Sequence, residues 1–528
     1  MSHRAEILCL VIAATGALSF MPTPAEPQAT VGLYDVFERS VTNSRAYANP
    51  YDFRVVELRA SFTAPSGRSV SFFGFYDGGT TWRLRFMPDE AGTWKYAWSW
   101  TDDTAGGSGS FSVTDTGLPG PARLDPQDAR LLADARGNPI HWRGYSLHNQ
   151  IYTDALTQGR ASDYIKQFIN PHVIDGGYNA VMLSVPCPQS RYDVKGGTLR
   201  GVGTDFIWRD HSRFNVRAAQ YFDAILRRLK DARVWTVTFT TFFFTYHKDE
   251  VERFFGDYKP FVRWFTARYA AFYNYFCWTP AWEMDCHFGN WESRVDQVMR
   301  YVVSIDPWKR LQGAHDTALG LWQDWQTLLP AQNPSRTVRG SNNRTSVEGT
   351  NCLNPFNKCI IAFENIWETT DTRWPGWDMP RNATEVRRAL WGALFANVLP
   401  IYDEMEDMPV WKGPERGAGN GYGEPDVKRA LTWWYETVGY RNSNFTIRNG
   451  LVSGSDKICS GTPGQEYLVY DEDGGSIAID LSGDGGSFSV LWYDPKNGVD
   501  KNGGTVAAGA SRTLTSPFSG DSVLRLKK

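Results

Sequence analysis

The sequence predicts an α/β protein in which a (β/α)8 TIM barrel is flanked by an N-terminal and a C-terminal β-sandwich domain. Short runs of alternating apolar and polar residues near both ends are typical of half-buried antiparallel strands. Between them, apolar runs alternate with amphipathic helices, which is the pattern of βα units. A length of 528 residues exceeds one ordinary domain and provides for two or three.

The first part of the chain predicts a secretory signal peptide over residues 1–29. Arg4 precedes an apolar run from Ile7 to Leu18, and small residues and prolines follow. The run is shorter than the roughly 20 residues that a membrane helix needs, and no later stretch replaces it. We therefore expect a secreted protein, extracellular or periplasmic, with no membrane span.

The two flanking β-sandwich domains are predicted over residues 31–118 and 455–528. Trp82–Phe86 and Glu466–Tyr470 are examples of their alternating runs, which are separated by Gly- and Asp-rich turns. A Gly- and Pro-rich linker, Asp115–Pro121, follows the first of them.

The barrel is predicted over residues 122–450, from strand-like runs that approach eight in number. These runs are His141–Leu147, Ala180–Ser184, Val234–Thr240, Phe276–Trp282, Leu311–Ala314, Ile360–Phe363, Val398–Tyr402 and a less marked one near Trp325. Apolar residues recur with the helical period over Ala218–Leu229, after a candidate cap at Asn215. They recur over Val295–Val303, where Asp306-Pro307 ends the pattern, and Asn382–Glu385 forms a candidate capping box.

The composition of the chain argues against one class of binding partner. The formal net charge is −3 and no block of Lys and Arg occurs, which argues against a nucleic-acid partner. Aromatic residues make up 14% of the chain, including 22 Trp. Such residues fill cores, and their faces also stack on the C–H faces of sugar rings, so both roles stay open.

The cysteines permit disulfides but do not indicate a metal site. Six remain after removal of the signal peptide, and Cys352 and Cys359 are the easiest pair to close. No C-x-x-C or H-x-x-x-H spacing occurs, so we expect no metal and no other cofactor.

Two strand-like runs end in carboxylates. Cys277–Cys286 contains Glu283, and Lys358–Glu368 contains Glu364, 81 residues further on (364 − 283). This spacing suits strands four and seven of a barrel, which face each other across one pocket. Glycosidic cleavage needs a protonated carboxyl and an ionised carboxylate, so the pair predicts a glycoside hydrolase. A lone strand-end acid can also be a salt-bridge partner at the rim, but two aligned ends favour catalysis.

Further residues near the predicted strand ends are candidates for sugar binding. Asp285 is two residues past Glu283, so it points to the same side of the strand if the strand continues. It is the alternative candidate for the catalytic acid. A core role is an alternative for Trp282. The candidate substrate-binding residues are His148, His247, Asp285, Trp282, Trp367, Glu368 and His315.

Residues from about Leu124 to Tyr440 resemble the DUF4038, apiosidase-like family of glycoside hydrolases. The matching motifs are Gly137–Gly144, Gly177–Met182, Asp306–Trp308 and Ile360–Glu368. The N-terminal region resembles DUF5060, and the C-terminal region resembles the "putative collagen-binding domain". The resemblance to retaining barrel enzymes implies Glu283 as acid/base and Glu364 as nucleophile.

The sequence therefore predicts a secreted hydrolase acting on a plant or microbial polysaccharide or oligosaccharide. The alternative is a non-catalytic carbohydrate- or matrix-binding protein with a degenerate barrel. The aligned strand-end glutamates favour the enzyme. No cluster of Tyr, Lys and His bases supports a lyase. The oligomeric state stays open.

Overall fold

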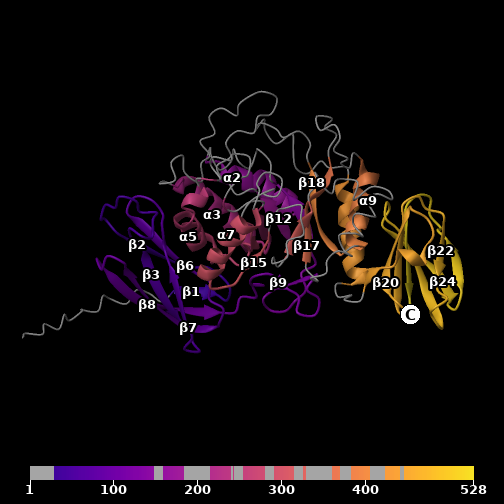
Figure 1. Cartoon of the computed structure of the whole chain (residues 1–528), viewed down its shortest axis with the longest axis horizontal. Helices are drawn as coiled ribbons and strands as arrows, with labels where there is room; N and C mark the ends of the chain where they lie inside the picture. The colour runs from indigo at the N-terminus through magenta and orange to yellow at the C-terminus, as the bar shows by residue number, and fades with distance from the viewer. Residues whose placement is uncertain are drawn as a thin grey trace, which may run out of the picture.

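The structure is a computed structural model, and three regions follow one another along its long axis (Figure 1). The N-terminal strands lie at one end, a layer of strands and helices in the middle, and the C-terminal strands at the other end. The structure describes residues 29–147, 159–183, 214–238, 242, 252, 254–279, 291–313, 325–328, 359–368, 382–395, 397–404, 423–439 and 445–528.

Residues 29–114 form two sheets that pack face to face. Their strands are β1 (Ala29–Gly32), β2 (Phe37–Thr42), β3 (Leu58–Thr63), β4 (Ser69–Phe73), β5 (Phe75–Tyr76), β6 (Thr81–Phe86), β7 (Gly92–Trp100) and β8 (Gly106–Thr114). One sheet has the order β1-β8-β7-β3-β4 and the other β2-β6-β5. Phe37 stacks on Phe111 with ring centroids 4.0 Å apart, and Phe62 stacks on Phe86 at 3.9 Å. These aromatic pairs join the two sheets into one apolar core.

After a short pair, β9 (Arg123–Leu124) and β10 (Leu132–Ala133), the central region of the described chain contains eight parallel strands. They are β11 (Gly144–Ser146), β12 (Ala180–Leu183), β13 (Trp235–Thr238), β14 (Cys277–Trp278), β15 (Leu311–Gln312), β16 (Trp325–Leu328), β17 (Cys359–Glu368) and β18 (Val398–Glu404). All eight coincide with predicted strands.

The order of these strands follows the sequence around an arc. One sheet has the order β13-β12-β11-β18-β17-β16, and a second consists of β14 and β15. A parallel bridge from Thr236 to Tyr275 joins β13 to the residues before β14. The first strand pairs with the last, with Gly144 opposite Ile401. Within the described ranges no pairing joins β15 to β16, so the arc has one seam there.

Within the described residues, helices follow β11, β12, β13, β14, β17 and β18, which confirms the predicted α/β class. They are α2 (Ala161–Tyr164) continuing as η1 (Ile165–Ile174), α3 (Val216–Asp231), α5 (Lys259–Tyr269), α7 (Trp291–Ile305), α9 (Ala383–Phe395) and α10 (Glu424–Trp433) continuing as η3 (Trp434–Val438). Two predicted caps are confirmed. Asn215 accepts a hydrogen bond from Ala218 N at 3.1 Å, and Asn382 accepts one from Glu385 N at 3.0 Å.

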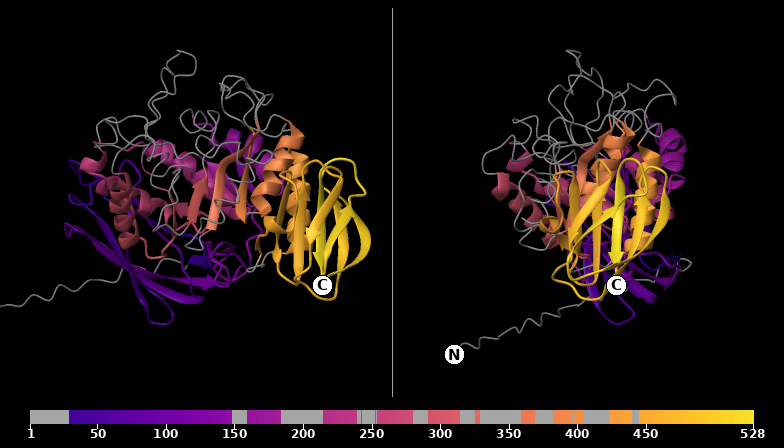
Figure 2. Two further views of the ribbon diagram at one scale, coloured as in Figure 1. Left: turned by 45° about the vertical axis from the view of Figure 1, so that its right-hand side comes forward. Right: turned by 90° about the vertical axis from the view of Figure 1, so that its right-hand side faces the viewer.

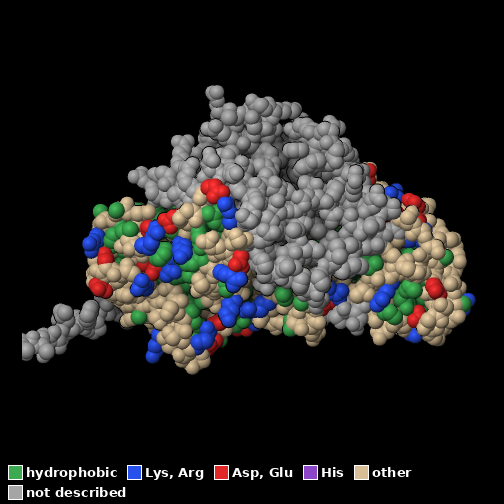
Figure 3. All heavy atoms as spheres, in the orientation of Figure 1, with side chains coloured by type: hydrophobic (Ala, Val, Ile, Leu, Met, Phe, Trp, Pro, Cys, Tyr) green, Lys and Arg blue, Asp and Glu red, His purple; other side chains and the backbone are tan. Residues whose placement is uncertain are grey.

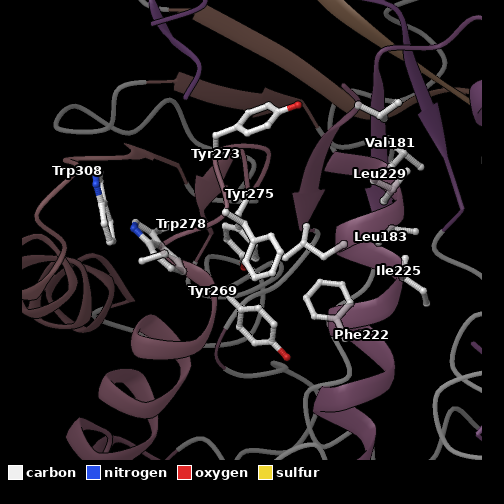
Figure 4. Packing of buried hydrophobic residues seen from close by; sticks show 14 of the residues in the cluster. Val181, Leu183, Phe222, Ile225, Leu229, Tyr269, Tyr273, Tyr275, Trp278 and Trp308 are labelled. Carbon is white, nitrogen blue, oxygen red and sulfur yellow. The ribbon is translucent and has the colours of Figure 1, made fainter. Parts of the chain in front are cut away.

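The parallel strands separate two apolar clusters. Because side chains alternate along a strand, one set faces the helices and the other faces inward. Figure 4 shows the outer set, in which Val181 and Leu183 of β12 pack with Phe222 and Ile225 of α3. The inner cluster consists of Ala122, Leu132, Ile140, Trp142, Ala180, Met182, Trp235, Val237, Phe276, Cys277, Leu311, Cys359, Ile361, Leu399 and Ile401. The residues of this inner cluster come from strands along the whole arc.

Residues 445–528 form a second β region. Its strands are β19 (Thr446–Ile447), β20 (Lys457–Thr462), β21 (Glu466–Asp471), β22 (Ser476–Asp480), β23 (Ser487–Asp494), β24 (Val499–Ala507), β25 (Ser511–Thr515) and β26 (Ser522–Lys527). The strand order β19-β20-β21-β26-β23-β24 makes one sheet, and β22 with β25 makes another. Ile477, Ile479, Phe488 and Leu524 share one core between them.

A buried ion network joins the N-terminal sheets to the central helices. Arg85 of β6 and Arg268 of α5 both bind the carboxylate of Asp223 in α3, with contacts of 2.6 to 3.1 Å. Arg268 also reaches Asp77 at 2.8 Å, and Arg85 reaches Glu38 at 2.7 Å. The Arg85 and Arg268 side chains are 2% and 0% exposed, so these charges interact away from water.

Helix α9 makes the corresponding contact with the C-terminal region, and Figure 2 shows it against the C-terminal strands. Arg387 donates to both carboxylate oxygens of Asp521, at 2.6 and 2.7 Å. Trp391 packs on Tyr470 with ring centroids 5.8 Å apart. Charged and aromatic contacts thus fasten the helix between β17 and β18 to the C-terminal sheet.

The suggested Cys352–Cys359 disulfide is wrong. Cys359 has a free thiol and lies fully buried in the inner cluster, at the start of β17. Burial raises the pKa of this thiol, which disfavours the reactive thiolate. Sequence proximity suggested the bond, but the inward position of Cys359 in a central strand excludes it from this structure.

On the face shown in Figure 3, acidic and basic side chains are interspersed over the described surface. No helix in the described part of the chain is long and apolar enough to cross a membrane.

We expect Asp223→Asn to lower the free energy of unfolding by about 3–5 kcal/mol, because Arg85 and Arg268 would remain buried without their shared carboxylate. Urea unfolding followed by Trp fluorescence at neutral pH measures this. Asp296→Asn is the matched control: its partner Arg300 has a 78% exposed side chain, so a change below about 1 kcal/mol is expected. Equal effects of the two substitutions would contradict the role given to Asp223.

The same carboxylate predicts a pH dependence. Burial alone would raise the pKa of Asp223, but Arg268 and Arg85 prevail and lower it from 3.8 to about 2. Its stabilisation is therefore complete above the unfolded pKa and is lost as pH falls toward the folded value. The stability difference between wild type and Asp223→Asn should shrink between about pH 5 and pH 3. A difference independent of pH would show that Asp223 does not titrate in this way.

Candidate active site

An irregularity in β17 surrounds Glu364, which lies in the half of this strand nearer its carboxyl end. β17 pairs with β18 in parallel, with Ala362 opposite Pro400 and Ile366 opposite Tyr402. Four steps along β17 therefore match two along β18, and Glu364 lies at the centre of this β17 bulge. Bulges occur next to active sites, where they re-aim side chains and interrupt pairing.

The described side chains of β17 and β18 lie in two clusters. Ile361 and Ile401 belong to the inner cluster, whereas Ile366 and Tyr402 belong to the outer cluster. The two extra residues of the bulge preserve the alternation between Ile361 and Ile366, because two steps return a strand to the same face.

The next two pairs along the strands are polar or aromatic. Trp367 lies opposite Asp403 in the backbone register. Glu368 lies opposite Glu404. Asp403 was missed by the sequence reasoning. Its signal was present, because Leu399–Glu404 is an apolar run that ends in acids, like the two predicted carboxylate strands.

Strand β11 lies on the other side of β18. Gly144 is opposite Ile401, so Ser146, two residues further, reaches the level of Asp403. Ser146 is 4% exposed and is the register partner of Met182 in the inner cluster. An aromatic, an acidic and a hydroxyl position thus follow one another across β17, β18 and β11.

Strand β14 leads toward Glu283. Cys277 belongs to the inner cluster, and its Sγ lies 3.5 Å from Thr279 Oγ1. Between them, Trp278 belongs to the outer cluster and donates its indole N–H to Asp306 Oδ2 at 2.8 Å. These contacts fix the carboxyl end of β14.

The structure describes three of the nine predicted site positions. Glu364, Trp367 and Glu368 lie on β17 at the positions given above. The others lie outside the described residues: Glu283, Trp282, Asp285, His148, His247 and His315. Their roles stay predictions. Within the described ranges, no group of three or more His, Cys, Asp or Glu side chains is arranged to hold a metal ion.

Two family models match the ends of the chain. Residues 30–101 match DUF5060, a domain of unknown function, and residues 445–526 match the "Putative collagen-binding domain of a collagenase". These matches confirm the resemblances predicted for the flanking regions, while the resemblance to DUF4038 stays a prediction. No curated protein matches the sequence.

Solved structures with a similar fold are described as glycoside hydrolases. A "putative glycoside hydrolase" from Bacteroides vulgatus has a TM-score of 0.69 and 18% identity, over 95% of this chain and 100% of that chain. A glycoside hydrolase family 5 protein from the same organism has a TM-score of 0.55 and 18% identity, over 78% of this chain and 95% of that chain. This chain therefore shares its fold with glycoside hydrolases.

Proposed function

We propose that this protein is a secreted glycoside hydrolase that cleaves glycosidic bonds of a plant or microbial polysaccharide. The observation that carries the proposal is the β17 bulge, which has Glu364 at its centre, in the half of a parallel strand nearer its carboxyl end. The fold shared with glycoside hydrolases supports it. Glu364 is one of two proposed catalytic carboxylates, and Glu283 is the other.

The proposed scaffold is a closed (β/α)8 barrel. It is supported by the parallel strands in sequence order, the pairing of the first strand with the last, and one inner cluster drawn from strands round the arc. A contact between β15 and β16 would close the ring. In such barrels active sites lie at the carboxyl ends of the strands, and Glu364 is proposed to serve that end from the second half of β17.

The proposed mechanism retains the anomeric configuration. Protonated Glu283 gives its proton to the leaving oxygen while the carboxylate of Glu364 attacks the anomeric carbon, which forms a glycosyl-enzyme ester. Glu283 then takes a proton from a water molecule, which attacks the same carbon and frees Glu364. The two carboxyl groups should lie ~5–5.5 Å apart; about 6.5–9.5 Å would instead imply inversion. Asp285 is the alternative acid, and no cofactor is needed.

The proposed organisation is a signal peptide over residues 1–29, an N-terminal β-sandwich over 31–118, a barrel over 122–450 and a C-terminal β-sandwich over 455–528. The packed sheets at both ends support the two sandwiches. Export to the extracellular space or periplasm is proposed from the signal peptide. A polysaccharide is the proposed partner.

A non-catalytic carbohydrate- or matrix-binding protein is the second candidate. The C-terminal match to a "Putative collagen-binding domain of a collagenase" favours it. A screen of polysaccharides and 4-nitrophenyl glycosides separates the two functions. Release of reducing sugar or nitrophenol supports the hydrolase, whereas binding without release from any of them supports the binding protein.

Substitution of the two glutamates should separate their roles. Glu364→Ala removes the nucleophile, so turnover should fall by about 10⁴-fold or more on every substrate. Glu283→Ala should affect an aryl glycoside with a good leaving group least, because that group needs no protonation. Asp296→Asn, whose side chain pairs with the exposed Arg300 on α7, is the control with nearly unchanged activity. Initial rates across leaving groups measure this.

Equal loss across all leaving groups in Glu283→Ala would contradict its role as acid. If Asp285→Ala were at the same time selectively active on good leaving groups, the acid role would pass to Asp285.

A further inference from the structure

We infer that a groove beside the five-stranded N-terminal sheet binds a negatively charged polysaccharide, whose carboxylate or sulfate groups pair with the guanidinium of Arg59. The inference rests on the proposed function in taking the ligand to be a polysaccharide. It gives a ligand to a region whose family match is to a domain of unknown function.

The groove lies where the five-stranded sheet meets the central helices. Its walls come from β3, β4 and β7 on one side and from α5 and the end of α7 on the other (Figure 1). Its volume is about 700 Å³, within the range of about 300–1,000 Å³ that is usual for ligand sites. Hydroxyl groups from both sides line it, namely those of Ser61, Ser71, Ser99 and Ser304.

Two guanidinium groups share one carboxylate in the wall of this groove. Glu57, whose side chain is 3% exposed, accepts a hydrogen bond from Nε of Arg59 at 2.9 Å and another from Nε of Arg263. Within the described residues, no second acid contacts either arginine. One negative charge therefore faces two positive charges, which leaves a positive charge in excess.

The excess charge is available on Arg59. Arg263 is 20% exposed, and its Cζ lies 3.8 Å from the centroid of the Phe73 ring. Arg59 is 66% exposed, and within the described chain its two terminal nitrogens have no hydrogen-bond partner, because Glu57 takes only Nε. Glu57 thus orients the guanidinium and leaves its terminal N–H groups for a ligand. A guanidinium binds two oxygens of a carboxylate or similar oxyanion side by side.

The other acid of the groove, Asp306, is satisfied within the fold. It is 3% exposed, its Oδ2 accepts the indole N–H of Trp278 at 2.8 Å, and its Oδ1 accepts the backbone N–H of Trp308 at 3.0 Å. The buried guanidinium of Arg310 also interacts with it electrostatically. Asp306 therefore does not neutralise Arg59.

The sheet beside the groove contains no acidic residue. Strands β1, β3, β4, β7 and β8 have no Asp or Glu, although the whole chain has more acidic than basic residues, 58 against 55. The charged residues of these strands are Arg59 and Lys95, and both are exposed. Hydroxyl residues occupy further exposed positions: Ser69, Ser71, Thr93, Ser99, Ser108 and Ser110. Such a surface complements a polyanion that is rich in hydroxyl groups.

The register of the strands places these hydroxyl groups in rows. Ser61 lies opposite Ser71 on β4 and Ala97 on β7, and Ala97 lies opposite Ser108 on β8. Neighbouring strands are ~4.8 Å apart, similar to the length of a sugar ring. A serine hydroxyl both donates and accepts hydrogen bonds, as sugar hydroxyls do. An acidic peptide supplies the charge without a matching density of hydroxyl groups.

The groove lies away from the edge at which catalysis is proposed. Helix α7 ends at Ile305 and β15 begins at Leu311, so the end of α7 lies at the amino edge of the central strands. Ser304 and Ile305 line the groove at this end. Active sites of barrels lie at the carboxyl edge. Loss of the groove should therefore leave the hydrolysis of a small soluble glycoside unchanged.

The test measures the binding of the full chain to three polymers by affinity gel electrophoresis. Alginate carries carboxylates, dextran sulfate carries sulfates, and dextran is uncharged. We expect retention by alginate, by dextran sulfate or by both, and none by dextran; the polymer bound identifies the anionic group. Arg59→Gln should raise the Kd about 10- to 100-fold, because charge-assisted hydrogen bonds are lost.

Arg68→Gln is the matched control. Arg68 lies between β3 and β4 and is 45% exposed, but its guanidinium is already bound by Asp89 and Glu90. The Kd of this variant should change less than about twofold. Thermal unfolding of both variants should resemble that of the wild type, because an exposed ion pair contributes little to stability.

A second pair of variants acts without removing Arg59. Ser71→Glu places a carboxylate at an exposed position of the groove and should weaken binding about as much as Arg59→Gln. Ser71→Gln has the same size without the charge and should weaken it less. This pair decides the question if Arg59→Gln does not fold.

The inference is overturned if Arg59→Gln binds like Arg68→Gln, if dextran binds as tightly as the charged polymers, or if no polymer binds. Equally tight binding of poly-L-glutamate would assign the groove to an acidic peptide and would also overturn it. None of these results depends on hydrolysis of 4-nitrophenyl glycosides. A wild type that binds the polymer through Arg59 but hydrolyses no glycoside would instead contradict the proposed function, so the two failures are distinguishable.

Discussion

The carboxylate of Asp223 is the constraint on which the relation between the N-terminal sheets and the central strands depends. Two guanidinium groups from different elements share it, and neither can be left unpaired at its depth without a large cost. Arg85 comes from β6 and Arg268 from α5, while Asp223 itself belongs to α3. A displacement of any one of these elements breaks contacts in the other two. The helices that support β12, β13 and β14 are thereby held against the N-terminal sheets.

Helix α9 imposes a second constraint at the other end of the molecule. It connects β17 with β18, the two strands that hold the Glu364 and Asp403 positions. One side of α9 packs on these strands through Ala389 and Leu390, and another contacts the C-terminal sheet through Arg387 and Trp391. The C-terminal region therefore braces the helix that joins the two acidic strands, and it is more than a tethered binding module.

Local sequence patterns predicted the helices and strands because these form through interactions between residues that are close together in the chain. Asn215 caps α3 through its own backbone neighbours, and the apolar period of that helix needs only the helix itself. Asp223 and Arg268, in contrast, belong to helices whose charged residues would ordinarily face water. Only the docking of β6 turns these charges into an interior network, so the sequence of α3 or α5 alone does not predict it. The error over Cys359 has the same origin, since spacing says nothing about burial.

The bulge and the choice between two adjacent acids show where sequence reasoning ends for the site. Asp403 and Glu404 follow the same apolar run, and a change of one residue in pairing would exchange their faces. The register of both acids is set by the partner strand of β18, which has Ile366 opposite Tyr402. The bulge sets four steps of β17 beside two steps of β18, with Glu364 at its centre. Such a shift depends on the partner strand, so the local sequence of β17 does not predict it.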